Sequence, residues 1–137
     1  MAGMEKGGCL CGKVHYEFAR DAAVSAHHCH CTDCQKCTGS GKATIIIVPT
    51  EALTINPDYK TYTVTGSAGS HVTRGFCPEC GGQVISYVEE NPAIRFIKAG
   101  SLDDSSWVTI ASSFWESTAP AWSPVDTSAP SFPGNPG

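Results

Sequence analysis

The cysteines of this 137-residue chain stand in tight groups, and their spacing is that of metal ligands. Two thiolates one or two residues apart can reach one ion from a single turn or strand, and two such pairs complete a tetrahedral zinc site. The eight cysteines therefore suffice for two zinc ions per chain. They form two outer pairs and one central run: Cys9 and Cys11, Cys77 and Cys80, and Cys29, Cys31, Cys34 and Cys37.

The two outer pairs together predict a closed, structural zinc site. Cys9 and Cys11 precede a predicted strand, and residues i and i+2 of an extended backbone face the same side. Cys77-Pro78-Glu79-Cys80-Gly81-Gly82 has the composition of a zinc-knuckle turn, in which glycines let backbone N–H groups approach the sulfurs. A zinc ion with four thiolate ligands has no position left for water or substrate.

The central run predicts an open zinc site that could be catalytic. Cys29, Cys31 and Cys34 supply three ligands, and three protein ligands with a vacant fourth position are typical of catalytic zinc. Three thiolates outweigh the charge of Zn²⁺, so the ion would polarise a carbonyl poorly. It would still deprotonate an incoming thiol, which would stay nucleophilic in so electron-rich a shell. The pattern favours activation of a substrate thiol toward an electrophilic carbon.

Other interpretations of the central run stay open at the level of spacing. Cys37 as a fourth ligand would give a second closed site and a non-catalytic, zinc-stabilised binding module. Cys34 and Cys37 could instead be a redox pair, although no thioredoxin-like βαβ pattern surrounds them. The spacing also leaves open which clusters pair with each other.

A disulfide-rich secreted domain is the main alternative to metal binding, because the cysteine count is even. Cys9 and Cys11 cannot readily bridge each other across one residue. Residues 1–6 contain no apolar signal region, and the strongest apolar run, residues 45–48, is far too short to span a bilayer. We therefore expect a cytoplasmic protein with reduced thiols and no membrane association.

The charge balance argues against a polyanionic partner. The formal net charge is −4 with histidine neutral, and no basic cluster with interleaved aromatic residues occurs. Nucleic acid and anionic membrane surfaces would select the opposite charge.

The remainder of the chain predicts a mostly β protein that holds these cysteines. Alternating or β-branched runs, separated by turn signals, are expected to be strands, and helical periodicity is weak. A short helix is expected to begin near Thr32, inside the central run. The length suits one domain, residues 1–122, followed by a Pro/Ser-rich tail, residues 123–137. The expected strands are residues 13–18, 44–48, 61–64, 83–87, 94–98 and 107–110.

Four sequence phrases resemble the glutathione-dependent formaldehyde-activating enzyme family, also called the GFA/CENP-V domain. They are Gly8-Cys9-Leu10-Cys11-Gly12, residues 28–36 (HCHCTDCQK), Thr38-Gly39-Ser40 and residues 74–81 (RGFCPECG). Residues 99–104 and the stretch from Phe114 and Trp115 to Trp122 are similar to further family phrases. The resemblance covers about residues 4–122.

The resemblance implies a compact, zinc-stabilised β fold with little helix and with two zinc ions. It assigns Cys9, Cys11, Cys77 and Cys80 to a structural zinc, and Cys29, Cys31 and Cys34 to a catalytic one. The implied reaction joins formaldehyde to glutathione to give S-hydroxymethylglutathione, and the reverse direction is that of a carbon–sulfur lyase. The implied partners are a small thiol such as glutathione and a small aldehyde.

Two positions depart from the family pattern, and several polar residues are further candidates. Cys37 stands where the family commonly carries a small or non-ligand residue, and Ser113 where many members have a histidine. His28 and His30 flank Cys29 and could bind the zinc, move a proton, or hydrogen-bond a ligand sulfur or the backbone. The residues that could attract the carboxylates of glutathione are Lys36, Lys42 and Arg74.

Overall fold

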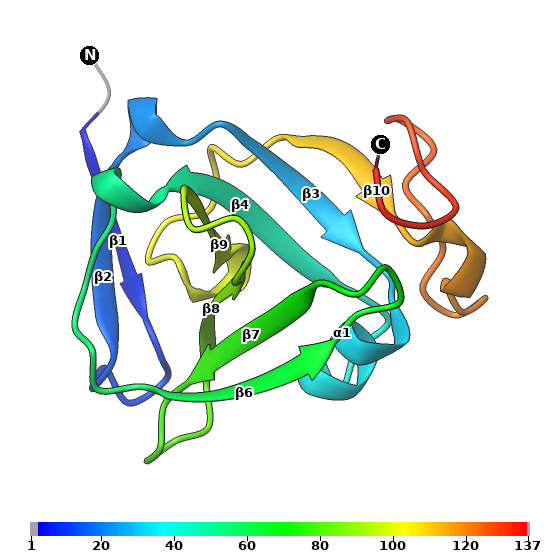
Figure 1. Ribbon diagram of the computed structural model, residues 1–137. Coiled ribbons are helices and arrows are strands. Elements are labelled where there is room, and N and C mark those ends of the chain that lie inside the picture. Colours follow the sequence, from blue (N-terminus) through cyan, green and yellow to red (C-terminus); the bar gives the residue numbers. More distant parts are fainter. Residues whose placement is uncertain (1–2, 137) are drawn as a thin grey trace. The chain divides into compact units, whose positions relative to one another are not determined.

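The computed structural model describes residues 3–136, and strands dominate it, as predicted (Figure 1). The chain divides into two units. The first unit comprises the residues up to Val24 together with Ile46–Trp107, and the second comprises Ser25–Ile45 together with the residues from Val108 onward. Within residues 3–136, no helix has both the length and the apolar character needed to cross a membrane.

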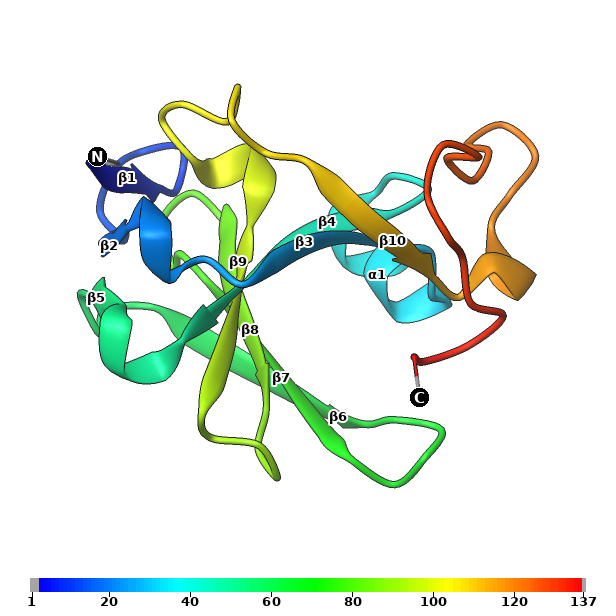
Figure 2. The same ribbon diagram turned by 90° about the horizontal axis from the view of Figure 1, so that it is seen from above.

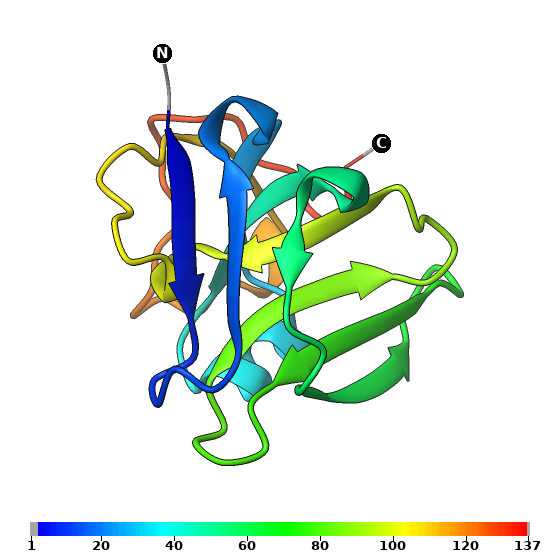
Figure 3. The same cartoon turned by 90° about the vertical axis from the view of Figure 1, so that its left-hand side faces the viewer.

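The first unit contains two groups of hydrogen-bonded strands. The antiparallel strands β1 (Met4–Gly8), β2 (His15–Ala19) and β5 (Thr54–Ile55) form a three-stranded sheet in the order β1-β2-β5 (Figure 3). In the second group the order is β4-β9-β8-β7-β6, where β4 contributes its residues beyond Ile45. The bounds of these strands are β4 Ala43–Pro49, β6 Lys60–Thr65, β7 His71–Phe76, β8 Gln83–Val88 and β9 Ile94–Lys98.

The second unit holds the central cysteine run on a strand and a helix. Strand β3 (Ser25–Cys29) lies between β10 (Ile110–Phe114) and the first residues of β4, and β3 runs parallel to β10 (Figure 2). The α-helix α1 (Thr32–Thr38) follows β3 almost directly. The structure also has short 3₁₀ helices in both units. Those of the first unit are η1 Arg20–Ala22, η2 Thr50–Ala52 and η3 Ala99–Ser101, and that of the second unit is η4 Glu116–Thr118.

The sequence patterns explain the best-defined elements. Alternation in β2 buries Tyr16 and Phe18 on one face, as a half-buried strand requires. The β-branched run of β4 is buried along most of its length, and the strand ends at Pro49, as predicted. Helix α1 begins at Thr32, as predicted, and ends where Gly39 adopts a left-handed conformation (φ 70°).

Some sequence expectations were wrong in position or missed an element. The expected strand at residues 107–110 lies instead at Ile110–Phe114, where a less apolar segment pairs with β3. Strands β1, β3, β5 and β7 were not predicted, because their sequences lack a clear period of two or are very short.

The C-terminal residues hydrogen-bond along β10. The Ser113 amide donates to the Pro130 carbonyl (3.0 Å), and the Phe132 amide donates to the Ser113 carbonyl (2.9 Å). The Trp115 amide likewise donates to the Gly134 carbonyl (3.1 Å). Backbone pairing thus holds part of the Pro/Ser-rich segment, while its division from the remainder of the chain at residue 122 stays a prediction.

A buried carboxylate fastens β1 within the first unit. Glu5 is 5% exposed and accepts hydrogen bonds from Arg20 Nε (2.8 Å) and from Trp107 Nε1 (2.9 Å). Arg20 Nη2 lies 2.7 Å from the same carboxylate, and the guanidinium stacks over the Trp107 ring at 5.3 Å.

Replacing this carboxylate by an amide is expected to destabilise the protein. Glu5→Gln turns one acceptor into an NH₂ group that faces the donors of Arg20, so the free energy of unfolding should fall by about 2 kcal/mol. Urea denaturation measures the change. The control is Glu17→Gln on β2, whose side chain is only half-buried. Equal stability of the two variants would contradict the role assigned to Glu5.

Candidate metal centres

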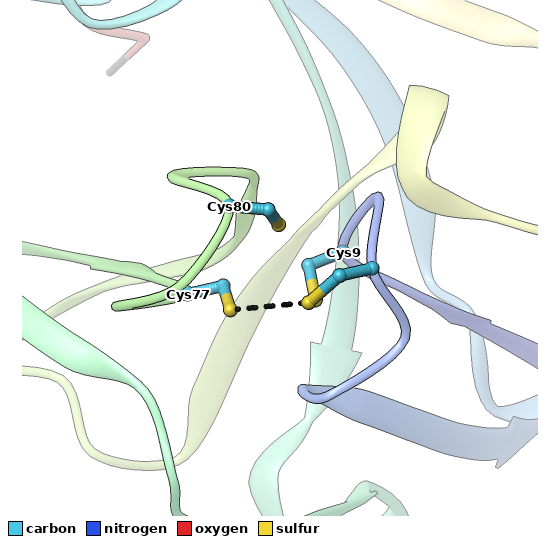
Figure 4. A group of neighbouring side chains, drawn as sticks. Cys9, Cys77 and Cys80 are labelled. Atoms are coloured by element: carbon cyan, nitrogen blue, oxygen red, sulfur yellow. Dashed lines mark hydrogen bonds between the residues drawn. The ribbon is translucent and has the colours of Figure 1, made fainter.

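The outer cysteine pairs converge on one point of the first unit. The sulfurs of Cys9, Cys11, Cys77 and Cys80, here named the four-thiol cluster, all lie within 4.8 Å of one another. Figure 4 shows Cys77 and Cys80 pointing from their turn toward Cys9 on the opposite loop. The Sγ–Sγ distances from Cys11 to Cys9 and to Cys77 are both 3.7 Å. A tetrahedral zinc with bonds of about 2.3 Å requires sulfurs about 3.8 Å apart, so the spacing fits zinc.

Tight turns with backbone donors build the four-thiol cluster. The amide of Val14 donates to Cys9 Sγ (3.2 Å), and the amide of Glu79 donates to Cys77 Sγ (3.3 Å). Gly81 adopts φ 75°, which lets the Cys77–Cys80 turn close. A Cβ at Gly82 would lie 3.2 Å from Cys9 Cβ and 3.4 Å from Cys80 Sγ, so the backbone approaches the sulfurs closely there.

The thiols of this cluster divide unequally between charged and neutral forms. The backbone amides of Cys11 and Gly82 lower the pKa of Cys80 to about 6. The Lys13 amide acts in the same direction on Cys11, but burial and the neighbouring thiols outweigh it and raise the Cys11 pKa to about 11. Without a cation, one thiolate suppresses the ionisation of its neighbours. A divalent ion with thiolate preference removes that conflict.

The first part of the central run forms a second cluster, within the second unit. The sulfurs of Cys29, Cys31 and Cys34, here named the three-thiol cluster, also lie within 4.8 Å of one another. Cys29 ends β3, Cys31 is the N-cap of α1, and Cys34 lies in the first turn of the helix. The Cys34 amide donates to Cys31 Sγ at 3.2 Å, so the cap itself sets the distance between these two residues.

The electrostatics of the three-thiol cluster also fit a cation. The hydrogen bonds that the Cys29 thiol donates to the sulfurs of Cys31 and Cys34, together with burial, raise the pKa of Cys29. Three thiols at ligand separation cannot all ionise while nothing balances their charge. Soft sulfur donors in this arrangement are compatible with zinc. The two clusters could therefore each hold a metal ion, and the assignment of one as structural and the other as catalytic stays a prediction.

The other residues that the sequence suggested as zinc ligands or substrate contacts are not part of the three-thiol cluster. Cys37 is exposed on α1 and lies outside the three-thiol cluster. His28 Nδ1 lies 2.8 Å from Thr44 Oγ1, and neither His28 nor His30 belongs to the cluster. His30 is fully buried and hydrogen-bonds the backbone, which was one of the roles considered for it. Lys36 is exposed on α1, whereas Arg74 is buried on β7 of the first unit.

Two residues that support the three-thiol cluster were missed from the sequence. Gln35 Nε2 donates to the His30 carbonyl (2.9 Å) and to the Thr118 carbonyl (3.0 Å). Thr118 Oγ1 also donates to the His30 carbonyl (2.8 Å). The position of Gln35 beside Cys34 was a signal that could have been followed, whereas nothing in the sequence near Thr118 points to the cysteines.

The two adjacent buried serines of β10 differ in hydrogen bonding. Ser112 Oγ lies 2.7 Å from His27 Nδ1. Ser113 is 0% exposed, and within residues 3–136 its hydroxyl has no hydrogen-bond partner. A buried hydroxyl without a partner loses its hydrogen bonds to water and gains none in the protein, which costs free energy of folding.

This difference predicts opposite effects of two alanine substitutions. Ser113→Ala should leave the free energy of unfolding unchanged or raise it by up to about 1 kcal/mol, because it removes an unsatisfied group. Ser112→Ala should lower the free energy of unfolding by about 1 kcal/mol, because it leaves His27 Nδ1 without its partner while Nε2 keeps Ser25. Thermal or urea unfolding of both variants checks the order. A larger loss for Ser113→Ala than for Ser112→Ala would show that the Ser113 hydroxyl is satisfied.

Two comparisons with known proteins found matches. The family model described as "Glutathione-dependent formaldehyde-activating enzyme" matches residues 4–118, a region that includes all eight cysteines. A crystal structure of a Rhodobacter sphaeroides protein, solved as a structural genomics target, is similar with a TM-score of 0.58 and 18% sequence identity. The match covers 93% of this chain and 99% of that one, and at this identity it shows a shared fold. No curated protein matches the sequence. The chain belongs to the glutathione-dependent formaldehyde-activating enzyme (GFA) family.

Proposed function

We propose that this protein is a zinc-dependent enzyme that activates a small thiol, glutathione in the first place, for addition to formaldehyde or a related aldehyde. The reverse reaction is carbon–sulfur cleavage, as in a lyase. The observation that carries the proposal is the difference between the clusters: one gathers four thiols and the other gathers three. A set of four closes a zinc site, whereas a set of three leaves one position for a substrate atom.

The cysteines of the three-thiol cluster would hold the ion, and a bound zinc would stabilise an incoming thiol as its thiolate. The negative charge of Cys29, Cys31 and Cys34 keeps that sulfur electron-rich, which favours its attack on carbon. A carbon–sulfur bond forms, the π electrons of the aldehyde move to oxygen, and the oxygen takes up a proton. That proton balances the one the thiol lost, so the sum is thiol plus aldehyde giving a hemithioacetal, which for formaldehyde is the S-hydroxymethyl compound.

Access and local charge support the same site. Cys29 and Cys31 are only half-buried, so a small thiol can approach them. Lys36 is exposed on the helix that carries Cys34, and Lys42 is half-buried in the same unit. Their positive charges would attract the carboxylates of glutathione.

The direct test is the rate of adduct formation. NMR exchange spectroscopy of formaldehyde with glutathione measures how fast S-hydroxymethylglutathione forms and dissociates, with and without the zinc-loaded protein. The proposal predicts an acceleration proportional to enzyme concentration. If the protein accelerated neither glutathione addition nor the addition of other small thiols across a set of small aldehydes, the proposal would be wrong.

A closed, non-catalytic second site is the alternative, and Cys37 is the residue that would make it. Cys37 follows Cys34 by three positions on α1, a spacing that places helical residues side by side. Because Cys37 lies outside the three-thiol cluster, we expect Cys37→Ser to keep two zinc ions per chain and full activity. Cys34→Ser, on the same helix, should lose one zinc. Loss of a zinc from Cys37→Ser, measured by metal analysis, would favour the binding-module interpretation.

A further inference from the structure

The residue between the first two thiols of the three-thiol cluster is buried and hydrogen-bonded through its backbone and its side chain. His30 separates Cys29 from Cys31 and is 0% exposed. Its amide donates to the Phe114 carbonyl (3.0 Å), and its Nδ1 donates to the Gly41 carbonyl (3.2 Å). Its Nε2 is buried without a hydrogen-bond partner in the described residues, so burial and these two bonds are what hold His30 between the two cysteines.

The carbonyl of His30 is the point where this peptide meets two other segments. It accepts from Gln35 Nε2 at 2.9 Å and from Thr118 Oγ1 at 2.8 Å. Gln35 lies on α1 directly after Cys34, so its side chain ties the peptide that carries two thiols to the helix that carries the third. The same Nε2 donates to the Thr118 carbonyl (3.0 Å), which makes the three residues one connected group.

A left-handed turn at the end of β10 brings Thr118 to this point. Trp115 has φ 61° and is the only non-glycine residue with positive φ within residues 3–136. Its amide donates to the Gly134 carbonyl (3.1 Å), and its indole Nε1 donates to Asn135 Oδ1 (2.7 Å). Such a conformation persists only where the surrounding contacts determine it, and it is often found beside functional sites.

We propose that Gln35 and Thr118 are positioning residues of the three-thiol cluster. By holding the His30 carbonyl, they keep Cys29 and Cys31 at ligand distance from Cys34 before an ion arrives. The inference rests on the proposed function only in that the three thiols are taken to hold zinc. Groups that orient metal ligands in this way commonly change metal affinity by about 10- to 100-fold when they are removed.

The test is a zinc-affinity measurement on hydroxyl-deleted variants. Thr118→Val keeps the shape of the side chain but removes the donor, and Thr118→Ser keeps the donor. The matched control is Thr50→Val, which removes a hydroxyl that donates to the Pro92 carbonyl (2.6 Å) in the first unit. Competition with a chromophoric zinc chelator measures a separate zinc affinity for each of the two clusters. The affinity that is absent in Cys31→Ser is that of the three-thiol cluster.

We expect Thr118→Val to weaken zinc binding at the three-thiol cluster by about 10-fold or more, with the four-thiol cluster unchanged. Thr118→Ser and Thr50→Val should both bind like the unaltered protein. In the Co²⁺-loaded protein, the sulfur-to-cobalt absorption of the three-thiol cluster should change in Thr118→Val alone. If Thr118→Val does not fold, Gln35→Met removes the other donor and should give the same selective loss.

The inference is overturned if these variants bind zinc at the three-thiol cluster with unchanged affinity, or if both clusters weaken equally. Neither result depends on catalysis. A selective loss of zinc affinity in a protein that accelerates no thiol addition would leave the inference standing and would contradict the proposed function. Normal catalysis together with an unchanged zinc affinity in Thr118→Val would overturn the inference and leave the proposed function standing.

Discussion

Replacing Cys31 by serine is expected to lower thiol-dependent turnover by more than about 100-fold while the protein stays folded. Loss of groups that merely orient metal ligands costs about 10- to 100-fold, and loss of a ligand should cost more. Serine at this position can still accept the hydrogen bond from the Cys34 amide, since serine is a good N-cap residue. The substitution therefore removes the thiolate and spares the helix.

The rate of hydroxymethylglutathione formation, the zinc content and the circular dichroism spectrum together check this prediction. The zinc content should fall from two ions to one per chain. Cys37→Ser is the control, because it removes an exposed thiol from the same helix. A Cys31→Ser protein that turned over at the normal rate would show that the three-thiol cluster is not the catalytic site.

Replacing Cys77 by alanine should have its main effect on stability. Cys77 is 0% exposed, and the four-thiol cluster joins residues 9–11 to residues 77–80 of the first unit. Structural zinc sites bind with apparent free energies of about 10–16 kcal/mol, and whole domains are stable by only about 5–15 kcal/mol. We therefore expect Cys77→Ala to lower the free energy of unfolding by more than about 4 kcal/mol or to prevent folding.

Thermal unfolding followed by circular dichroism measures this effect, with Cys31→Ser as the comparison. Strong chelators should unfold the unaltered protein in the same way, and added zinc should restore it. The opposite order, with Cys31→Ser the less stable variant, would mean that the structural and catalytic assignments are exchanged.

Both clusters could be predicted from sequence because their ligands are close in the chain. The turn Cys77–Cys80 and the group from Cys29 to Cys34 follow from local backbone geometry. The helix at Thr32 could be predicted for the same reason, since an N-cap and a first turn are local features. Cys9 and Cys11 do meet, but the extended backbone expected for them was wrong: they lie in a turn in which the Gly12 amide donates to the Cys9 carbonyl (3.1 Å). Which cysteine pairs share one site is not a local property of the chain. The family resemblance indicated the pairing, and the sulfur distances agree with it.

What the sequence did not show depends on contacts between distant segments. Strand β3 contains Ser25, Ala26 and His27, with no β-branched residue, and it is a strand because β10 and β4 lie on either side of it. Residues 107–110 have the stronger strand composition, but pairing with β3 selects Ile110–Phe114. The hydrogen bond from Thr118 to His30 spans 88 positions, and no local pattern could indicate it.

Native mass spectrometry of the reduced protein, with and without glutathione, tests the central claim most directly. The account predicts two zinc ions per chain and one glutathione adduct, and it predicts that Cys31→Ser carries one zinc and forms no adduct. Two zinc ions with no adduct under any glutathione concentration, or an adduct that persists in Cys31→Ser, would contradict an open thiol-binding site at Cys29, Cys31 and Cys34.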